Sequence, residues 1–137
     1  PHFKTFSCDY LQQIVKRLKV LHPDIPIILF TKGGGQWLST LADTGCDALG
    51  LDWTCDLARA RREVGERVVL QGNLDPAVLL TSPQCVQAEV ARVLASFGVG
   101  SGHIFNLGHG ITPDVPPEHV SAMVKAVHAL SPAYHRG

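Results

Sequence analysis

Four short segments of the sequence combine polar side chains with glycine or proline and could carry chemistry. Each follows a short apolar run, and the four segments are 31–35 (TKGGG), 52–54 (DWT), 71–76 (QGNLDP) and 106–110 (NLGHG). If the apolar runs are parallel strands, these segments lie beyond the carboxyl ends of the strands, where α/β proteins bind ligands. The candidate site residues in these segments are Lys32, Asp52, Asp75 and His109.

His109 is the strongest single candidate. It stands between Gly108 and Gly110, which predicts a side chain with little packing around it and a backbone free to aim it. An imidazole side chain can donate a hydrogen bond or a proton near neutral pH. The alternative is an exposed loop histidine, and the position favours a ligand-contacting role.

The other candidates each have a structural alternative. Asp52 and Asp75 could form an acid–base pair, but Asp75 precedes Pro76 and Asp52 could cap a following helix, so we interpret both as loop-shaping. Lys32 could face an anionic ligand or be simply solvated. The glycines at 33–35 match neither a P-loop nor a dinucleotide-binding pattern, which leaves a turn or a ligand-approach loop.

Metal and covalent chemistry have little support in the sequence. The cysteines at 8, 46, 55 and 85 form no CxxC pair, so we expect reduced thiols that act mainly as small buried apolar groups. Motifs of zinc proteases and serine esterases are absent. We therefore expect neither a structural nor a catalytic metal, and about one zinc per chain in elemental analysis would contradict this.

Helical and extended apolar patterns alternate along the chain. Apolar residues recur at helical spacing from Leu11 to Leu21, after a candidate N-cap at Ser7. The continuous apolar run that follows, 25–30, is typical of a strand covered on both faces. Further strands are predicted at 47–51, 68–70 and 103–107, and further helices at 37–42 (stopping at Gly45), 56–64, 83–97 after an N-cap at Ser82, and 117–127.

This order predicts a leading helix and four βα units, hence a parallel α/β sheet. A complete (βα)8 barrel takes ~250 residues, so 137 residues suit about half of one, and we expect the C-terminal half. A small doubly wound sheet is the rival architecture. We expect one partial domain over residues 1–137.

Composition excludes several classes of protein. Lys and Arg total 12 against 12 Asp and Glu, so no basic field exists for nucleic-acid binding. The longest purely apolar run, 27–30, is far below the ~20 residues of a membrane helix. The chain opens at Pro1 without a signal-peptide pattern, and its one methionine is Met123. We expect a soluble piece of a longer cytoplasmic protein.

Five motifs together resemble the uroporphyrinogen decarboxylase family. They occur in order over essentially the whole chain: FTKGGGQW at 30–37, GLDW at 50–53, LQGNLDP at 70–76, FNLGHGI at 105–111 and DVPPEH at 114–119. The match is to the C-terminal part of that family only. The resemblance implies a (βα)8 barrel, a cytoplasmic homodimer and porphyrin and haem biosynthesis.

The resemblance also implies a reaction and a site. The family converts the four acetate side chains of uroporphyrinogen III to methyl groups, giving coproporphyrinogen III and CO2 without a cofactor. His109 matches the family histidine that hydrogen-bonds a substrate carboxylate. The family's central aspartate, which contacts the pyrrole N–H groups, and its substrate-binding arginines belong to segments upstream of Pro1, so no catalytic residue is assigned here.

Two alternatives remain open. Corrinoid methyltransferases of the same superfamily bind zinc through cysteines, but Lys32 and His109 occupy the corresponding places here. The other alternative is an inactive fragment that only binds a tetrapyrrole or a partner chain. For the isolated 137 residues we expect no turnover, because most catalytic groups are missing.

Overall fold

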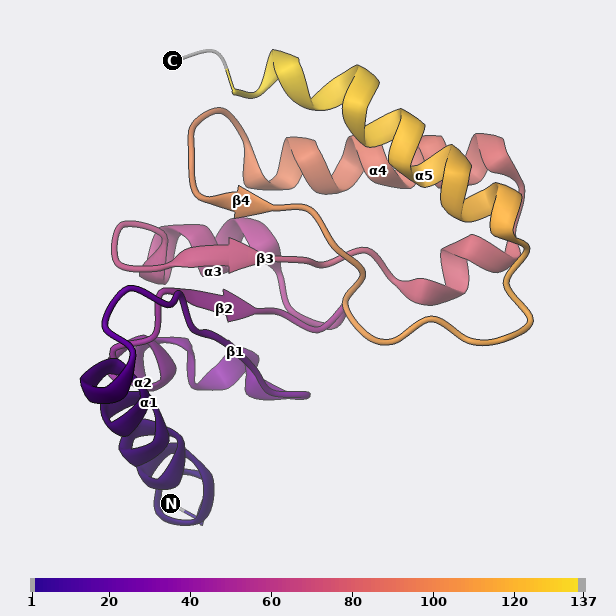
Figure 1. Ribbon diagram of the computed structural model, residues 1–137. Helices are drawn as coiled ribbons and strands as arrows, with labels where there is room; N and C mark the ends of the chain where they lie inside the picture. The colour runs from indigo at the N-terminus through magenta and orange to yellow at the C-terminus, as the bar shows by residue number, and fades with distance from the viewer. Residues whose placement is uncertain (1, 136–137) are drawn as a thin grey trace.

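The computed structural model describes residues 2–135 and contains one parallel sheet (Figure 1). Its strands are β1 (Ile28–Phe30), β2 (Ala48–Gly50), β3 (Val69–Gln71) and β4 (His103–Ile104). Their order is β1-β2-β3-β4, so each strand pairs with the next one along the chain. A doubly wound sheet reverses its strand order at a switch point. The unbroken order is therefore that of a partial barrel-type fold.

Helices alternate with these strands, as predicted. In chain order the helices are η1 (Lys4–Cys8), α1 (Asp9–Leu21), η2 (Gly34–Gln36), α2 (Leu38–Ala42), α3 (Leu57–Val64), η3 (Pro76–Leu80), α4 (Pro83–Phe97), α5 (Pro117–Leu130) and η4 (Ser131–Ala133). In Figure 1, α1 and α2 lie at the β1 end of the sheet, and α4 and α5 lie at the β4 end. No described helix is long and apolar enough to cross a membrane. Of the predicted single domain, residues 1, 136 and 137 lie outside the described range.

The core lies on one face of the sheet. Strand register aligns Leu29 with Leu49 and Leu49 with Leu70, so the three side chains share a face. All three belong to the same buried cluster as apolar residues of the surrounding helices, which include Leu41, Val64 and Val90. This face therefore holds the helices to the sheet through burial of apolar surface.

The opposite face is more open, and the prediction that the first strand is covered on both faces was wrong. Ile28 is 44 % exposed, Phe30 is 48 % exposed, and Ile104 at the other end of the sheet is 41 % exposed. Successive residues of a strand point to opposite faces, so Leu29 enters the helix-covered core while its two neighbours point away from it. A continuous apolar run cannot show this difference.

Several element boundaries also differ from expectation, and the first strand begins at Ile28 instead of residue 25. Ser7 is not a helix N-cap, because it lies inside η1, and the helix continues into α1 without a side-chain cap. The fourth strand ends at Ile104 instead of residue 107, although Leu107 still forms an isolated parallel bridge with Leu74. Loop hydrogen bonds replace the regular ladder here: the Leu74 amide donates to the Asn106 carbonyl, and the Gly108 amide donates to the Leu74 carbonyl.

The N-cap at Ser82 was predicted correctly, whereas α3 begins at Leu57 and its cap is Asp56, not Asp52. The Ser82 hydroxyl accepts a hydrogen bond from the Cys85 amide, and Pro83 opens α4. The Asp56 carboxylate caps α3 by accepting from the Arg59 amide at 2.8 Å. By contrast, α2 ends at Ala42, and Gly45 takes a left-handed conformation in the turn beyond it, with φ at +87°.

The four cysteines are free thiols, and only some of their side chains are buried as predicted. Cys8 and Cys46 are buried, Cys55 is partly buried and Cys85 is exposed. Cys85 sits in the first turn of α4, on the side that faces away from the buried residues of that helix. The expectation of small buried groups is therefore confirmed for Cys8 and Cys46 and wrong for Cys85.

His103 is a partly buried aromatic residue whose side chain connects β4 to α4. Its ring stacks on Phe97 with centroids 4.5 Å apart, and its Nε2 lies 2.7 Å from the Gly72 carbonyl oxygen, to which it donates in the neutral form. Burial lowers the pKa of His103 below its ordinary value of 6.5, although the hydrogen bond to Gly72 acts in the opposite direction. The folded state therefore favours the neutral imidazole of His103 over the protonated imidazolium.

We expect His103 to make stability depend on pH. Between its lowered folded pKa and the ordinary value of 6.5, the unfolded chain binds more protons, so acidification below about pH 6.5 favours unfolding. His103→Phe keeps the stack on Phe97 and removes the titration. Urea unfolding at pH 8 and pH 5.5 should show a smaller loss of stability on acidification in the variant than in the parent. Equal losses would contradict the assignment.

Candidate active site

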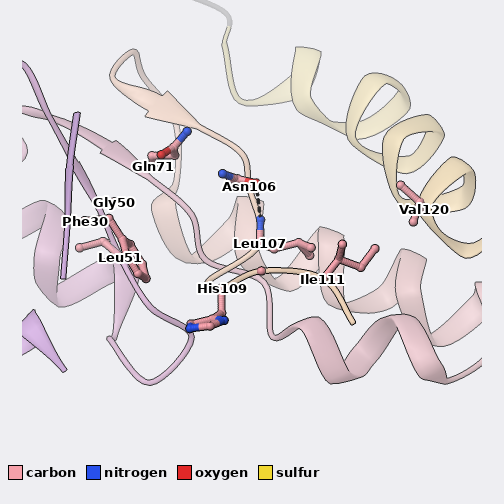
Figure 2. Close-up of a pocket in the computed structure, with 10 residues that line it drawn as sticks. Phe30, Gly50, Leu51, Gln71, Asn106, Leu107, His109, Ile111 and Val120 are labelled. Atoms are coloured by element: carbon pink, nitrogen blue, oxygen red, sulfur yellow. Dashed lines mark hydrogen bonds between the residues drawn. The ribbon is translucent and has the colours of Figure 1, made fainter. Parts of the chain in front are cut away.

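An open cavity of about 520 Å³ lies at the carboxyl ends of the strands (Figure 2). Figure 2 shows Phe30, Gly50 and Leu51 on one side of it and Ile111 and Val120 on the other. Gln71 and Asn106 bring polar amides, and His109 lies at the loop that follows β4. The lining combines a mainly apolar surface with a few polar groups, as ligand sites usually do.

Space for Phe30 in this cavity depends on a glycine in the neighbouring strand. Gly50 pairs with Phe30 across β1 and β2, and a Cβ at residue 50 would lie 3.1 Å from Cδ2 of Phe30. Even an alanine there would require Phe30 to shift by a few tenths of an ångström. The glycine at residue 50 therefore leaves room for the apolar Phe30 ring to form one wall of the cavity.

The exposed His109 side chain lies against two aromatic rings at the mouth of the cavity. Its ring makes an edge contact with Trp53 at a centroid distance of 5.6 Å and with Phe30 at 6.2 Å. Three strand exits thus meet at one imidazole, those of β1, β2 and β4. The His109 ring therefore has more packing contacts than its flanking glycines suggested, and its edge remains accessible to a ligand.

The two glycines beside His109 have different roles. Gly108 is buried, and a Cβ there would lie 2.8 Å from Cα of Trp53 and 2.9 Å from the Asp52 carbonyl carbon. At Gly110 a Cβ would meet no atom within 4 Å. Gly108 therefore allows the His109 loop to pack directly on the Asp52–Trp53 backbone, and the expectation of a freely aimed backbone holds only on the Gly110 side.

This difference predicts opposite outcomes for two single-methyl changes. Gly108→Ala should force the two loops apart and lower the free energy of unfolding by about 1–3 kcal/mol. Gly110→Ala should change it by less than about 0.5 kcal/mol, or stabilise slightly, because the chain loses freedom when unfolded. Urea unfolding of both variants measures the contrast. Equal stabilities would show that the loops do not require a glycine at 108.

Asp52 is a buried carboxylate whose oxygens are committed to the loop structure. Oδ2 accepts from the Gly33 amide at 2.5 Å, and Oδ1 accepts from the Thr54 amide at 2.8 Å and from its hydroxyl at 2.5 Å. Burial alone would raise the pKa of Asp52, but these hydrogen bonds and the Lys32 charge outweigh it and hold the pKa below 3.8. Asp52 is therefore ionised at neutral pH and is no proton donor.

Asp75 also has a structural role, and the acid–base pair is not supported. Its carboxylate accepts from the Ala77 amide at 2.9 Å and caps η3. Both aspartates thus hold backbone N–H groups, which agrees with the loop-shaping interpretation.

The glycine-rich segment after β1 is a turn in which the Gly33 and Gly34 amides are bonded within the protein. Gly33 has a left-handed φ of +72°, which favours glycine, and its amide donates to Asp52. The Gly34 amide donates to the Thr31 carbonyl at 3.2 Å. These donors are not free to cradle a phosphate, so the turn interpretation is the better one.

Sequence reasoning did not single out Asn73. Its buried side-chain amide donates to the Asp52 carbonyl at 2.9 Å and to the Cys55 carbonyl at 2.6 Å, which ties the β3 exit loop to the β2 exit loop. An amide side chain in a short loop between Gly72 and Leu74 was the available signal, because such a loop leaves backbone carbonyls that need donors.

Lys32 lies at the same edge. Its Nζ is 5.5 Å from the centroid of the Trp53 ring, a cation–π distance. Within residues 2–135, no three His, Cys, Asp or Glu side chains group in a way that could hold a metal ion. Burial also raises the pKa of the Cys55 thiol, which opposes the thiolate form that zinc binds.

Comparison with known proteins gives consistent matches over nearly the whole chain. A family model described as uroporphyrinogen decarboxylase (URO-D) matches residues 1–130. Uroporphyrinogen decarboxylase from Legionella pneumophila (strain Lens) is 67 % identical over 134 residues, which cover 98 % of this chain and 38 % of the relative. The Pseudomonas fluorescens protein of the same name is 58 % identical and is also covered to 38 % of its length. The chain thus spans little more than a third of these relatives.

One solved structure shares the fold. A methyltransferase from Methanosarcina mazei superposes with a TM-score of 0.77 at 24 % sequence identity, over 93 % of this chain and 36 % of that one. At this identity the likeness concerns the arrangement of strands and helices alone.

Proposed function

Since the chain belongs to the uroporphyrinogen decarboxylase family, we propose that it is the C-terminal part of an enzyme that converts uroporphyrinogen III to coproporphyrinogen III. In this reaction four acetate side chains lose CO2 and become methyl groups. Residues 1–137 form one partial domain of the barrel. The complete protein acts in porphyrin and haem biosynthesis as a cytoplasmic homodimer, as the family resemblance implies.

The observation that carries this proposal is the position of His109. Its ring stands at the mouth of the cavity, where the exits of β1, β2 and β4 meet. An imidazole N–H there donates a hydrogen bond to a carboxylate of the bound substrate. The apolar side chains of Phe30, Leu51 and Ile111 offer surface to the tetrapyrrole ring.

The chemistry needs little more than positioning and charge from the protein. Protonation of a pyrrole carbon makes the ring an electron sink, the bond to the carboxylate carbon breaks, and the electron pair moves into the ring as CO2 leaves. A second proton then adds to the exocyclic carbon and completes the methyl group, and the ring carbon releases the first proton, so that one proton is consumed for each CO2 lost. Asp52 stays ionised and bonded to its loop, so within this chain His109 is the candidate donor at the cavity. The carboxylate that stabilises the cationic ring comes from the family's upstream segments.

The methyltransferase alternative has less support. A zinc-thiolate site would need cysteines where this chain has Lys32 and His109. The structural neighbour of that name contributes the fold and no site residue.

The proposal is tested by activity of the complete protein. Chromatography of uroporphyrinogen III incubated with it anaerobically should show partly decarboxylated intermediates and coproporphyrinogen III. The isolated 137-residue chain should give none above the uncatalysed background, because it lacks the upstream groups. A complete protein that leaves uroporphyrinogen unchanged would overturn the proposal.

A further inference from the structure

We propose that Lys32 binds a carboxylate of the substrate beside His109, with the Trp53 ring as the platform that both side chains contact at the strand exits. This inference rests on the proposed function and adds a substrate-binding residue to it.

The geometry joins three loops through one aromatic ring. Lys32 Nζ lies 5.5 Å from the centroid of Trp53, and the His109 ring makes a perpendicular contact with that same ring at 5.6 Å. Trp53 is 36 % exposed, so the cluster borders solvent at the strand exits. The Trp53 backbone is itself fixed, because Asp52 binds the next amide in the chain and Gly108 packs on it.

The charge of Lys32 is free to act on a ligand. Lys19, Arg59, Arg67 and Arg92 each pair with a carboxylate, whereas no carboxylate of the described residues lies within 4 Å of Lys32 Nζ. Asp52 feels the charge of Lys32, but its oxygens already accept hydrogen bonds from Gly33 and Thr54. Lys32 is also the sole lysine or arginine in the four segments that follow the strands.

A polycarboxylate substrate needs such a group at this place. Moving a carboxylate from water to the edge of an apolar cavity is costly unless a cation or hydrogen-bond donors replace the lost water. The ammonium group carries three N–H donors and can rest on the indole while it binds an anion. Lys32, in the loop after β1, and His109, in the loop after β4, then bind carboxylates of the same macrocycle.

The test compares two lysine variants of the complete protein. Lys32→Gln should raise KM for uroporphyrinogen III about 5-fold, the size expected of one solvent-accessible ion pair, and reduce kcat by less than about twofold. Lys32→Arg should keep KM near the parent value, because it keeps the charge. Lys16→Gln removes the same charge on the exposed surface of α1, and it should leave KM unchanged. Rising salt should raise KM less in Lys32→Gln than in the parent.

Different failures are distinguishable. If Lys32→Gln and Lys16→Gln give the same KM, Lys32 binds no carboxylate, although the parent's turnover still supports the decarboxylase function. If the parent shows no turnover, the function fails, and quenching of tryptophan fluorescence by uroporphyrinogen III tests Lys32 directly. Weaker binding in Lys32→Gln alone would support the carboxylate site in that case, and equal binding in both variants would overturn it.

Discussion

Replacement of His109 by alanine is expected to lower the turnover of uroporphyrinogen III by the complete enzyme about 10- to 150-fold. That range corresponds to losing one hydrogen bond to a charged carboxylate, about 1.5–3 kcal/mol, if the bond is stronger in the transition state. The imidazole is exposed and contacts Phe30 and Trp53 only through ring edges, so the melting temperature should change little.

His109→Asn is the matched variant. Asparagine can donate a hydrogen bond but cannot deliver a proton, so it should retain more activity than alanine if the group acts as a donor. Turnover and thermal unfolding of both variants are measured side by side. Full activity in His109→Ala would remove His109 from the site, and a collapse of stability in that variant would make the residue structural.

Replacement of Asp52 by alanine is expected to lower the free energy of unfolding by about 3 kcal/mol. The change removes a buried acceptor and leaves the Gly33 and Thr54 amides without their partner. The acceptor is a buried carboxylate, and hydrogen bonds to a charged group contribute about 1.5–3 kcal/mol each. Activity should fall as well, because the loop that Asp52 shapes carries Trp53, against which His109 rests.

Asp75→Ala is the control for this effect. Asp75 caps η3 through one amide and is less buried, so its loss should cost about 1 kcal/mol, as for an ordinary helix cap. Urea denaturation of the two variants gives the comparison. Equal destabilisation by the two changes would show that the hydrogen bonds of Asp52 do not dominate the stability of these loops.

The alternation of elements was predictable because it depends on local physics. Apolar spacing of 3.6 residues and short β-branched runs report which face or segment must be buried, whatever the partner is. The cap at Ser82 is equally local, since its hydroxyl accepts a hydrogen bond from the amide three residues further along the chain. Ser7 failed because a cap needs the helix to begin there, and here the chain is already helical before it.

The sequence therefore predicts the order of strands and helices and the candidate residues at the strand exits, with His109 first among them. Which of those candidates hold the loops in place and which can contact a ligand depends on the tertiary structure. Asp52 became a loop anchor, Lys32 and His109 came to share the ring of Trp53, and Gly108 proved necessary for close packing. Each outcome depends on contacts between loops far apart in the chain. Local patterns carry no information about which groups such loops bring together.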